Sequence, residues 1–297
     1  MLETVDPQLL ENVDLPPRIE RLRARFFSFP PAISIFRARA FTQVARENPA
    51  LPTVLLKARS FYRACETLPI YIGPDELIVG HPGGQPRAGI FSPEICWRWL
   101  DRELDTVGTR PQDPYFVSEA DQEILRTEIF PFWRGRSVDE YISAELEELG
   151  LLALAVQSGV MDCEVKSTSG GGDLSPGYAN VLFTKGYAGI KQDAQARLAQ
   201  LDLRDHDDIE RCHFLKSLVI VCDALALLAG RYADLADALA LEAASLGRAE
   251  ELRRIATVCR RVPAEPPRTL HEALQAIWFG QVALFLEENT SGPSPGR

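Results

Sequence analysis

Histidine and methionine are scarce in this sequence, and the short motifs that mark common cofactor and metal sites are missing. There are 4 His and 2 Met among 297 residues. No G-x-G-x-x-G follows a predicted strand, and neither G-x-x-x-x-G-K-[ST] nor H-E-x-x-H occurs, which excludes the usual dinucleotide, P-loop and zinc-protease fingerprints. The 6 cysteines form no C-x-x-C pair and the histidines lack ligand spacing, so we expect reduced thiols and no metal site.

A dense basic block and a long apolar run are also absent. The net charge of −10 disfavours non-specific binding to nucleic acid. The basic residues between 18 and 25 have helical spacing, which is typical of a solvated helix face. The longest apolar run, 218–229, contains Asp223 and is shorter than the ~20 residues of a membrane span. With no signal-peptide pattern at the N-terminus, we predict a cytoplasmic protein that binds neither nucleic acid nor membrane.

Helical periodicity dominates what is present. Apolar residues recur at three- and four-residue steps, and prolines separate the segments. One short β-branched segment, 77–80, follows a Gly-Pro-Asp turn and is predicted to be a strand. A Gly- and Ser-rich stretch, 159–177, is predicted to be a loop. We therefore expect a mainly α fold with minor β, with helices over 18–27, 34–47, 55–68, 179–200, 207–246 and 270–287.

Polar caps mark several further helix starts. Ser92 and Ser118 each precede an acidic first turn. Ser137-Val138-Asp139-Glu140 fits a capping box that opens a helix to about residue 154, and Thr269-Leu270-His271-Glu272 fits another. The helix that follows this second box is apolar on nearly all sides over 276–286, which predicts burial between other elements.

Four stretches of the sequence together resemble one family. They are P-R-A-G-I-F-S-P-E at 86–94 after D-E-L-I-V-G at 75–80, T-R-P-Q-D at 109–113 before I-F-P-F-W at 129–133, G-D-L-S-P-G-Y-A-N-V-L at 172–182, and P-R-T-L-H-E-A-L-Q-A-I-W-F at 267–279 before E-E-N at 287–289. Their order resembles the N-terminal third of pyruvate formate-lyase-like glycyl-radical enzymes, nearest to the dehydratase and C–X lyase group. The whole chain, 1–297, is then the N-terminal portion of one such domain, with 1–17 expected to be flexible.

The resemblance implies an α/β barrel of ten strands, of which this chain is the N-terminal part. It also implies a glycyl radical near the C-terminus, a catalytic cysteine on a loop inside the barrel, and a small-molecule substrate. A separate radical-SAM activating enzyme with an iron–sulfur cluster installs the radical, so no cofactor is expected on this chain itself. The complete enzyme is expected to be a homodimer.

The sequence departs from the family at the residues that carry the chemistry. The Cys-x-Glu motif is absent, since Cys163-Glu164 has the wrong spacing. The Arg-Val-x-Gly motif is absent too, because Arg261-Val262-Pro263-Ala264 has no glycine where the radical must sit. We therefore expect no catalytic residue in this chain, which is interpreted as an inactive N-terminal fragment of a C–O or C–X bond-cleaving lyase or dehydratase, or of a formate acetyltransferase-like enzyme. Two alternatives remain: a non-catalytic helical scaffold or partner-binding module derived from that lobe, and an unrelated all-α regulatory protein.

Three residues are candidates for substrate binding by the same resemblance. Gly172-Asp173 occupies the place of a Gly-His step that faces the substrate, so Asp173 could orient a hydroxyl or cationic group. The alternative role of Asp173 is to cap the turn at 174–177. Asn289 and Ser291 occupy a stretch that reads Glu-Ser-Asn-Gly-His-Ser in the family, and here Ser291 stands in place of the His.

Overall fold

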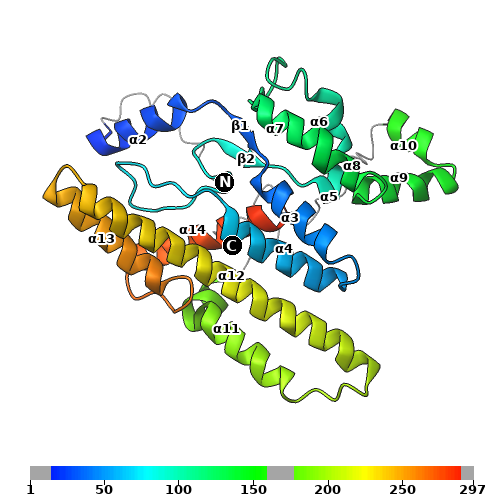
Figure 1. Cartoon of the computed structure of the whole chain (residues 1–297). Coiled ribbons are helices and arrows are strands. Elements are labelled where there is room, and N and C mark those ends of the chain that lie inside the picture. Colours follow the sequence, from blue (N-terminus) through cyan, green and yellow to red (C-terminus); the bar gives the residue numbers. More distant parts are fainter. Residues whose placement is uncertain (1–14, 159–176, 289–297) are drawn as a thin grey trace, which may run out of the picture.

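The computed structural model describes residues 15–158 and 177–288 of this chain, and within them helices predominate (Figure 1). The prediction of a mainly α fold is confirmed. The two strands, β1 (Ala32–Ser34) and β2 (Ala88–Ile90), are parallel and pair with Ile33 opposite Gly89. Parallel sheets are normally larger and covered on both faces. The ten-stranded barrel that the resemblance implies is thus represented by two short strands in the described part of the chain.

The long helix α12 (His206–Glu242) is the central element of one half of the structure. It packs against α4 (Thr53–Thr67), α11 (Phe183–Leu198) and α13 (Leu246–Arg261), as Figure 1 shows. Asp205 caps it by accepting a hydrogen bond from the amide of Asp207 at 3.0 Å. By length and apolarity alone, α12 passes the test for a membrane span. Core helices share that length and apolarity, and α12 is packed between three other helices.

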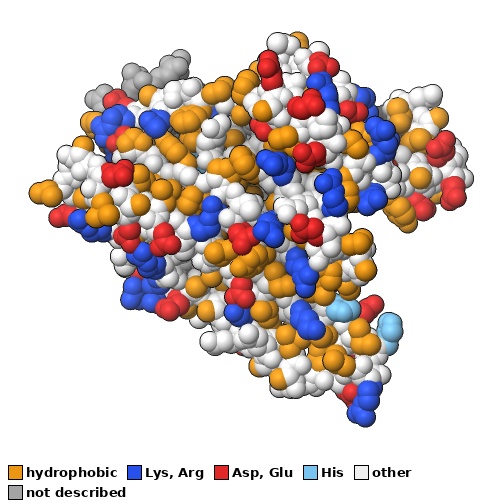
Figure 2. All heavy atoms as spheres, in the orientation of Figure 1, with side chains coloured by type: hydrophobic (Ala, Val, Ile, Leu, Met, Phe, Trp, Pro, Cys, Tyr) orange, Lys and Arg blue, Asp and Glu red, His pale blue; other side chains and the backbone are white. Residues whose placement is uncertain are grey.

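The second half of the structure carries the strands and a series of shorter helices. One face of α3 (Phe36–Glu47) and one face of α4 are buried in a common core that α12 shares. The remaining elements of this half are α2 (Pro17–Ser28), α5 (Pro93–Cys96), α6 (Arg98–Glu103), α7 (Glu119–Ile124), the π-helix η1 (Leu125–Ile129), α8 (Phe130–Trp133), α9 (Val138–Glu148) and α10 (Leu152–Ser158). Acidic and basic side chains are interspersed on the face drawn in Figure 2, with no large basic block there.

Two of the three serine caps act as predicted. The Ser118 hydroxyl accepts from the amide of Asp121 at 3.1 Å, and Ser137 forms the reciprocal capping box with Glu140. Ser92 precedes the proline that opens α5, but its hydroxyl makes no capping bond. The helix predicted to reach residue 154 ends earlier, because Gly150 takes a left-handed conformation with φ of 67° and separates α9 from α10.

The predicted strand at 77–80 is wrong, and the reason lies in α14 (Leu270–Glu288). No strand in the described part of the chain pairs with this segment. Instead the side chain of Gln275 accepts from the amide of Val79 at 2.8 Å and donates to its carbonyl at 2.7 Å. Trp278 donates to the carbonyl of Gly80 at 2.8 Å. Side chains of one helix therefore satisfy backbone groups that a strand would otherwise pair, since buried backbone groups need partners.

The predicted helix over 179–200 contains two irregularities. It begins as the π-helix η2 (Tyr178–Leu182) and continues as α11, which is kinked at Gly186. Beyond the kink, the amide of Tyr187 donates to the carbonyl of Pro263, and that of Ala188 to the carbonyl of Ala264. The helix predicted over 207–246 also differs: α12 ends at Glu242, and α13, which was not predicted, begins after a new cap.

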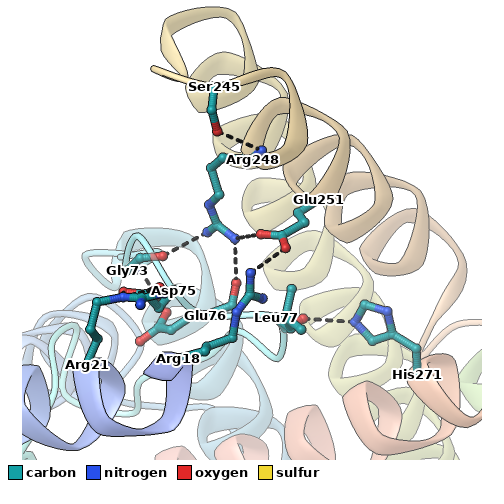
Figure 3. A network of polar contacts seen from close by, with 10 residues as sticks. All are labelled: Arg18, Arg21, Gly73, Asp75, Glu76, Leu77, Ser245, Arg248, Glu251 and His271. Carbon is teal, nitrogen blue, oxygen red and sulfur yellow. Dashed lines mark hydrogen bonds and ion pairs between the residues drawn. The ribbon is translucent and has the colours of Figure 1, made fainter. Parts of the chain in front are cut away.

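A polar network fastens α2 to the rest of the fold (Figure 3). Arg21 holds Asp75 through two nitrogens at 2.6 and 3.0 Å, and Arg18 pairs with Glu251. Arg248 donates to the carbonyls of two residues in the same turn, Gly73 and Glu76. The basic face of α2, predicted to be solvated, is therefore partly used in ion pairs, while none of its residues is buried.

Candidate functional site

The three predicted substrate-binding residues lie outside the described part of the chain. Asp173, Asn289 and Ser291 all fall in ranges that the structure does not describe, as does Cys163. Their predicted roles stay predictions. The described residues that adjoin them do have defined positions, however. These are the start of η2, which follows Asp173 by five residues, and the end of α14, which precedes Asn289.

The start of η2 packs directly on α14. Tyr178 belongs to a small apolar cluster that includes Ala276, and a Cβ on Gly280 would lie 3.1 Å from the Tyr178 ring. The Tyr178 hydroxyl is buried with no hydrogen-bond partner among the described residues, and desolvation raises its pKa. From Gly280 to Glu287 is about 10 Å along a helix at ~1.5 Å per residue. The described residues nearest to both predicted substrate-binding stretches, at the start of η2 and at the end of α14, therefore lie along α14.

The C-terminal end of α14 is held by Arg37 from α3. Arg37 is 1% exposed, and it donates from Nε to the carbonyl of Leu286 at 2.5 Å and from Nη2 to that of Glu287 at 2.6 Å. Its guanidinium lies 3.7 Å from the ring centroid of Phe41 and forms an ion pair with Glu94 at 2.5 Å. The last carbonyls of α14, which have no partner within the helix, thereby gain charged donors.

A second cation reaches the end of α14, and further buried polar atoms lie at the ends of the two strands. Lys57 of α4 pairs with the Glu287 carboxylate at 2.5 Å. Ser34 and Ser92 stand at and just after the carboxyl ends of β1 and β2, the end of a parallel sheet at which α/β proteins bind ligands. Four buried atoms here have no hydrogen-bond partner among the described residues: Ser34 Oγ, Arg37 Nη1, Ser92 Oγ and Glu94 Oε2.

A small apolar cavity of about 160 Å³ runs along α14 between these two contacts. It opens between α4, α11, α12 and α14. Its lining residues are Phe61, Tyr187, Val221, Leu225, Gly280, Ala283, Leu284 and Glu287. Burial raises the pKa of Tyr187, so its hydroxyl is not a base near neutral pH. The cavity offers apolar contact with one carboxylate at its edge and holds no nucleophile.

The thiols of the described residues are buried. There are five of them, in Cys65, Cys96, Cys212, Cys222 and Cys259. Desolvation raises the pKa of Cys222 to about 11 and that of Cys259 to about 12, which keeps both protonated at neutral pH. Among the described residues, no three His, Cys, Asp or Glu side chains are grouped in a way that could hold a metal ion.

The fold and these sequence stretches match glycyl-radical enzymes. The family model described as "Pyruvate formate lyase-like" matches residues 10–297, and the chain belongs to that family. The match excludes the unrelated all-α regulatory protein and confirms the family that the four stretches indicated.

The similar proteins are lyases and dehydratases. The chain is 34% identical over 266 residues to an isethionate sulfite-lyase of Oleidesulfovibrio alaskensis, covering 88% of this chain and 32% of that protein. It is 32% identical to the trans-4-hydroxy-L-proline dehydratase of Clostridioides difficile, covering 94% of this chain and 35% of that protein. The glycerol-bound glycerol dehydratase of Clostridium butyricum superposes with a TM-score of 0.87 at 30% identity, over 96% of this chain and 36% of that one. The chain spans about a third of the length of these relatives.

Sequence reasoning missed the contacts at the end of α14. Arg37 stands among apolar residues, close to Ile35, Ala38 and Phe41, all of which are buried. A single arginine on an otherwise apolar helix face was the available signal. Its partners could not be read from the pattern, because Glu94 lies 57 residues away and Leu286 lies 249 residues away.

Proposed function

We propose that this chain is the N-terminal portion of a glycyl-radical lyase or dehydratase that cleaves a C–O or C–X bond. The observation that carries the proposal is the family match over 10–297 together with coverage of about a third of each relative. The relatives and structural neighbours include proteins named for glycerol, 1,2-propanediol and hydroxyproline. Since all three are small hydroxylated molecules, a small hydroxylated molecule is the proposed substrate class.

The chemistry requires residues that this sequence does not contain. A thiyl radical must abstract hydrogen from the substrate, and a glycyl radical must generate that thiyl. Neither the Cys-x-Glu motif nor the Arg-Val-x-Gly motif occurs in this chain, and the buried thiols of the described residues cannot replace them. The chain alone is therefore proposed to be inactive. A radical-SAM activating enzyme would act on the remainder of the complete enzyme, which we propose to be a cytoplasmic homodimer.

The proposed role of this portion is to bind substrate and exclude water. Closed sites protect reactive intermediates from side reactions. Asp173, Asn289 and Ser291 remain the proposed substrate contacts. Asp173 precedes η2 in the sequence and the other two follow α14, and η2 packs on α14 through an apolar cluster.

The second candidate function is a partner-binding module without catalysis. The largely apolar helix α14 is packed inside the fold, with Ala276, Phe279 and Leu286 all buried. The observation that now favours it is the arm formed by α9 and α10. Leu154 and Val156 on α10 are 63% and 67% exposed, and acidic side chains gather at the end of the arm (Figure 2). Contiguous exposed apolar surface marks interaction sites more often than scattered exposed residues do.

Electron paramagnetic resonance tests the proposed inactivity of the chain alone. The 297-residue chain is incubated under anaerobic conditions with a radical-SAM activase and S-adenosylmethionine. We expect no doublet from a glycyl radical, whereas a full-length relative in the same assay gives one. A doublet from this chain contradicts the proposed inactivity. Sedimentation velocity addresses the alternative: a stable monomer supports a binding module, whereas aggregation supports a portion that needs the rest of a larger fold.

A further inference from the structure

The helix α9 carries charges at both ends that its own dipole does not favour. The C-terminal end of a helix is partly negative and is stabilised by basic residues. The last turn of α9 has no basic residue, and it contains the exposed acids Glu145, Glu147 and Glu148. Two exposed arginines, Arg134 and Arg136, stand just before the positive N-terminal end. Within one molecule this arrangement is unfavourable at both ends.

These charges have no counter-charge in the described part of the chain. The acids in the first turn of α9 do have partners, since Asp139 pairs with Arg98 at 2.6 Å and Glu140 closes the capping box. By contrast, no described carboxylate pairs with Arg134 or Arg136, and no described cation pairs with the three glutamates of the last turn. The two arginines lie over aromatic rings, which orient them at the base of the arm.

An exposed stripe along α9 joins the two charged ends. Val138, Tyr141, Glu145 and Glu148 follow one another at three- and four-residue steps, so they lie along one side of the helix. Val138 and Tyr141 are 43% and 68% exposed. The helix packs against α5 and α10 at the outer edge of the structure (Figure 1). From its N-terminal to its C-terminal end, this side of the arm therefore presents cations, an apolar centre and acids.

We propose that this side of α9 is a contact between two copies of the chain, in which the two α9 helices pack antiparallel around Tyr141. A two-fold axis at Tyr141 brings Arg134 of one copy opposite Glu148 of the other, and Arg136 opposite the stretch 145–147. Each negative helix end then lies beside the arginines of the other copy. A second copy has the required order of charges, and a two-fold contact satisfies both ends at once.

The contact gives a surface to the homodimer proposed for the complete enzyme, and its role there rests on that proposed function. The association itself is a property of α9 in this chain. Exposed ion pairs each contribute little and are screened by salt. The dimer is therefore weak and sensitive to ionic strength.

Sedimentation velocity of the 297-residue chain over about 5 to 500 µM protein tests the contact. We expect a discrete dimer that grows with concentration and whose association constant falls about tenfold in about 0.5 M NaCl. The double variants Glu145→Arg/Glu148→Arg and Arg134→Glu/Arg136→Glu should each weaken the dimer at least about tenfold, because like charges then face each other. An equimolar mixture of the two should restore a dimer, since one variant is then mainly basic on this side and the other is acidic.

The matched control is the double variant Glu210→Arg/Glu250→Arg. It changes the net charge as much as Glu145→Arg/Glu148→Arg does, at exposed positions on α12 and α13, and it should leave the dimer unchanged. A chain that stays monomeric or only aggregates overturns the proposal. So does a dimer that persists in both α9 variants, or one that the control weakens equally. A mixture that stays monomeric refutes the pairing of charges.

The proposed function fails by a different measurement. A glycyl-radical doublet from this chain would contradict the proposed inactivity without changing the sedimentation result. A chain that is monomeric at every concentration and gives no doublet would overturn the α9 contact and leave the proposed inactivity standing.

Discussion

The substitution Gly186→Ala tests the kink that joins α11 to the loop before α14. Gly186 has φ of 62° and ψ of 176°, a combination open essentially only to glycine. A Cβ at this position would lie 2.2 Å from the carbonyl oxygen of Ala264 and 2.8 Å from its carbonyl carbon. Because both atoms are backbone, no side-chain rotation can relieve the contact.

The expected cost follows from two contributions. The unfavourable backbone conformation costs about 1–3 kcal/mol for a residue with a side chain. Moving the loop away from the new Cβ weakens the bonds from Tyr187 to Pro263 at 3.0 Å and from Ala188 to Ala264 at 2.9 Å, each of which contributes about 1 kcal/mol. We therefore expect Gly186→Ala to lower the free energy of unfolding by about 3–5 kcal/mol.

Urea denaturation followed by far-UV circular dichroism measures the effect, with Gly230→Ala as the control. Gly230 lies inside α12, and no atom would lie within 4 Å of its added Cβ. Alanine there should stabilise the protein by about 0.5–1 kcal/mol, because glycine is a poor helix former. A loss below about 1 kcal/mol for Gly186→Ala would refute the steric argument. Equal losses at both positions would show that any change to a helix glycine is tolerated poorly.

Three further predictions concern polar contacts. Gln275→Leu leaves the buried N–H and C=O of Val79 without partners, so we expect urea denaturation to show a free energy of unfolding lower by about 2–4 kcal/mol. Gln275→Glu should recover little of this loss, because a carboxylate cannot donate to the Val79 carbonyl. A hydrogen bond from Arg268 lowers the pKa of Glu272 below its ordinary 4.5. The carboxylate therefore stabilises the fold above that pH, and this contribution disappears as the pH falls through the lower folded pKa. Glu272→Gln should flatten the acid side of the profile of stability against pH, and an unchanged profile contradicts the assignment. The helix α2 has no buried residue and is fastened by ion pairs, so 1 M NaCl should speed its removal by trypsin while the cleavage of α12 stays constant.

The segment at 77–80 shows how much a local sequence pattern can predict. Its β-branched residues favour an extended backbone, and the backbone is not helical there. Whether such a segment becomes a strand depends on what lies beside it. Here the neighbour is Gln275, which is 196 residues from Val79 in sequence. No local sequence feature predicts the hydrogen bonds between these two residues. The actual strands, β1 and β2, are three residues each, too short for a period-two pattern to stand out.

The sequence by itself determined the features whose partners are close along the chain. The capping box of Ser137 and Glu140 was predictable because its two hydrogen bonds join residues three positions apart. The family was also fixed by sequence, since four ordered stretches identify it without any coordinates. Only the tertiary structure decided how Arg37 is used and why position 186 must be glycine. Arg37 meets α14 and Gly186 meets Ala264 across many intervening residues, and chain folding rather than local preference brings those atoms together.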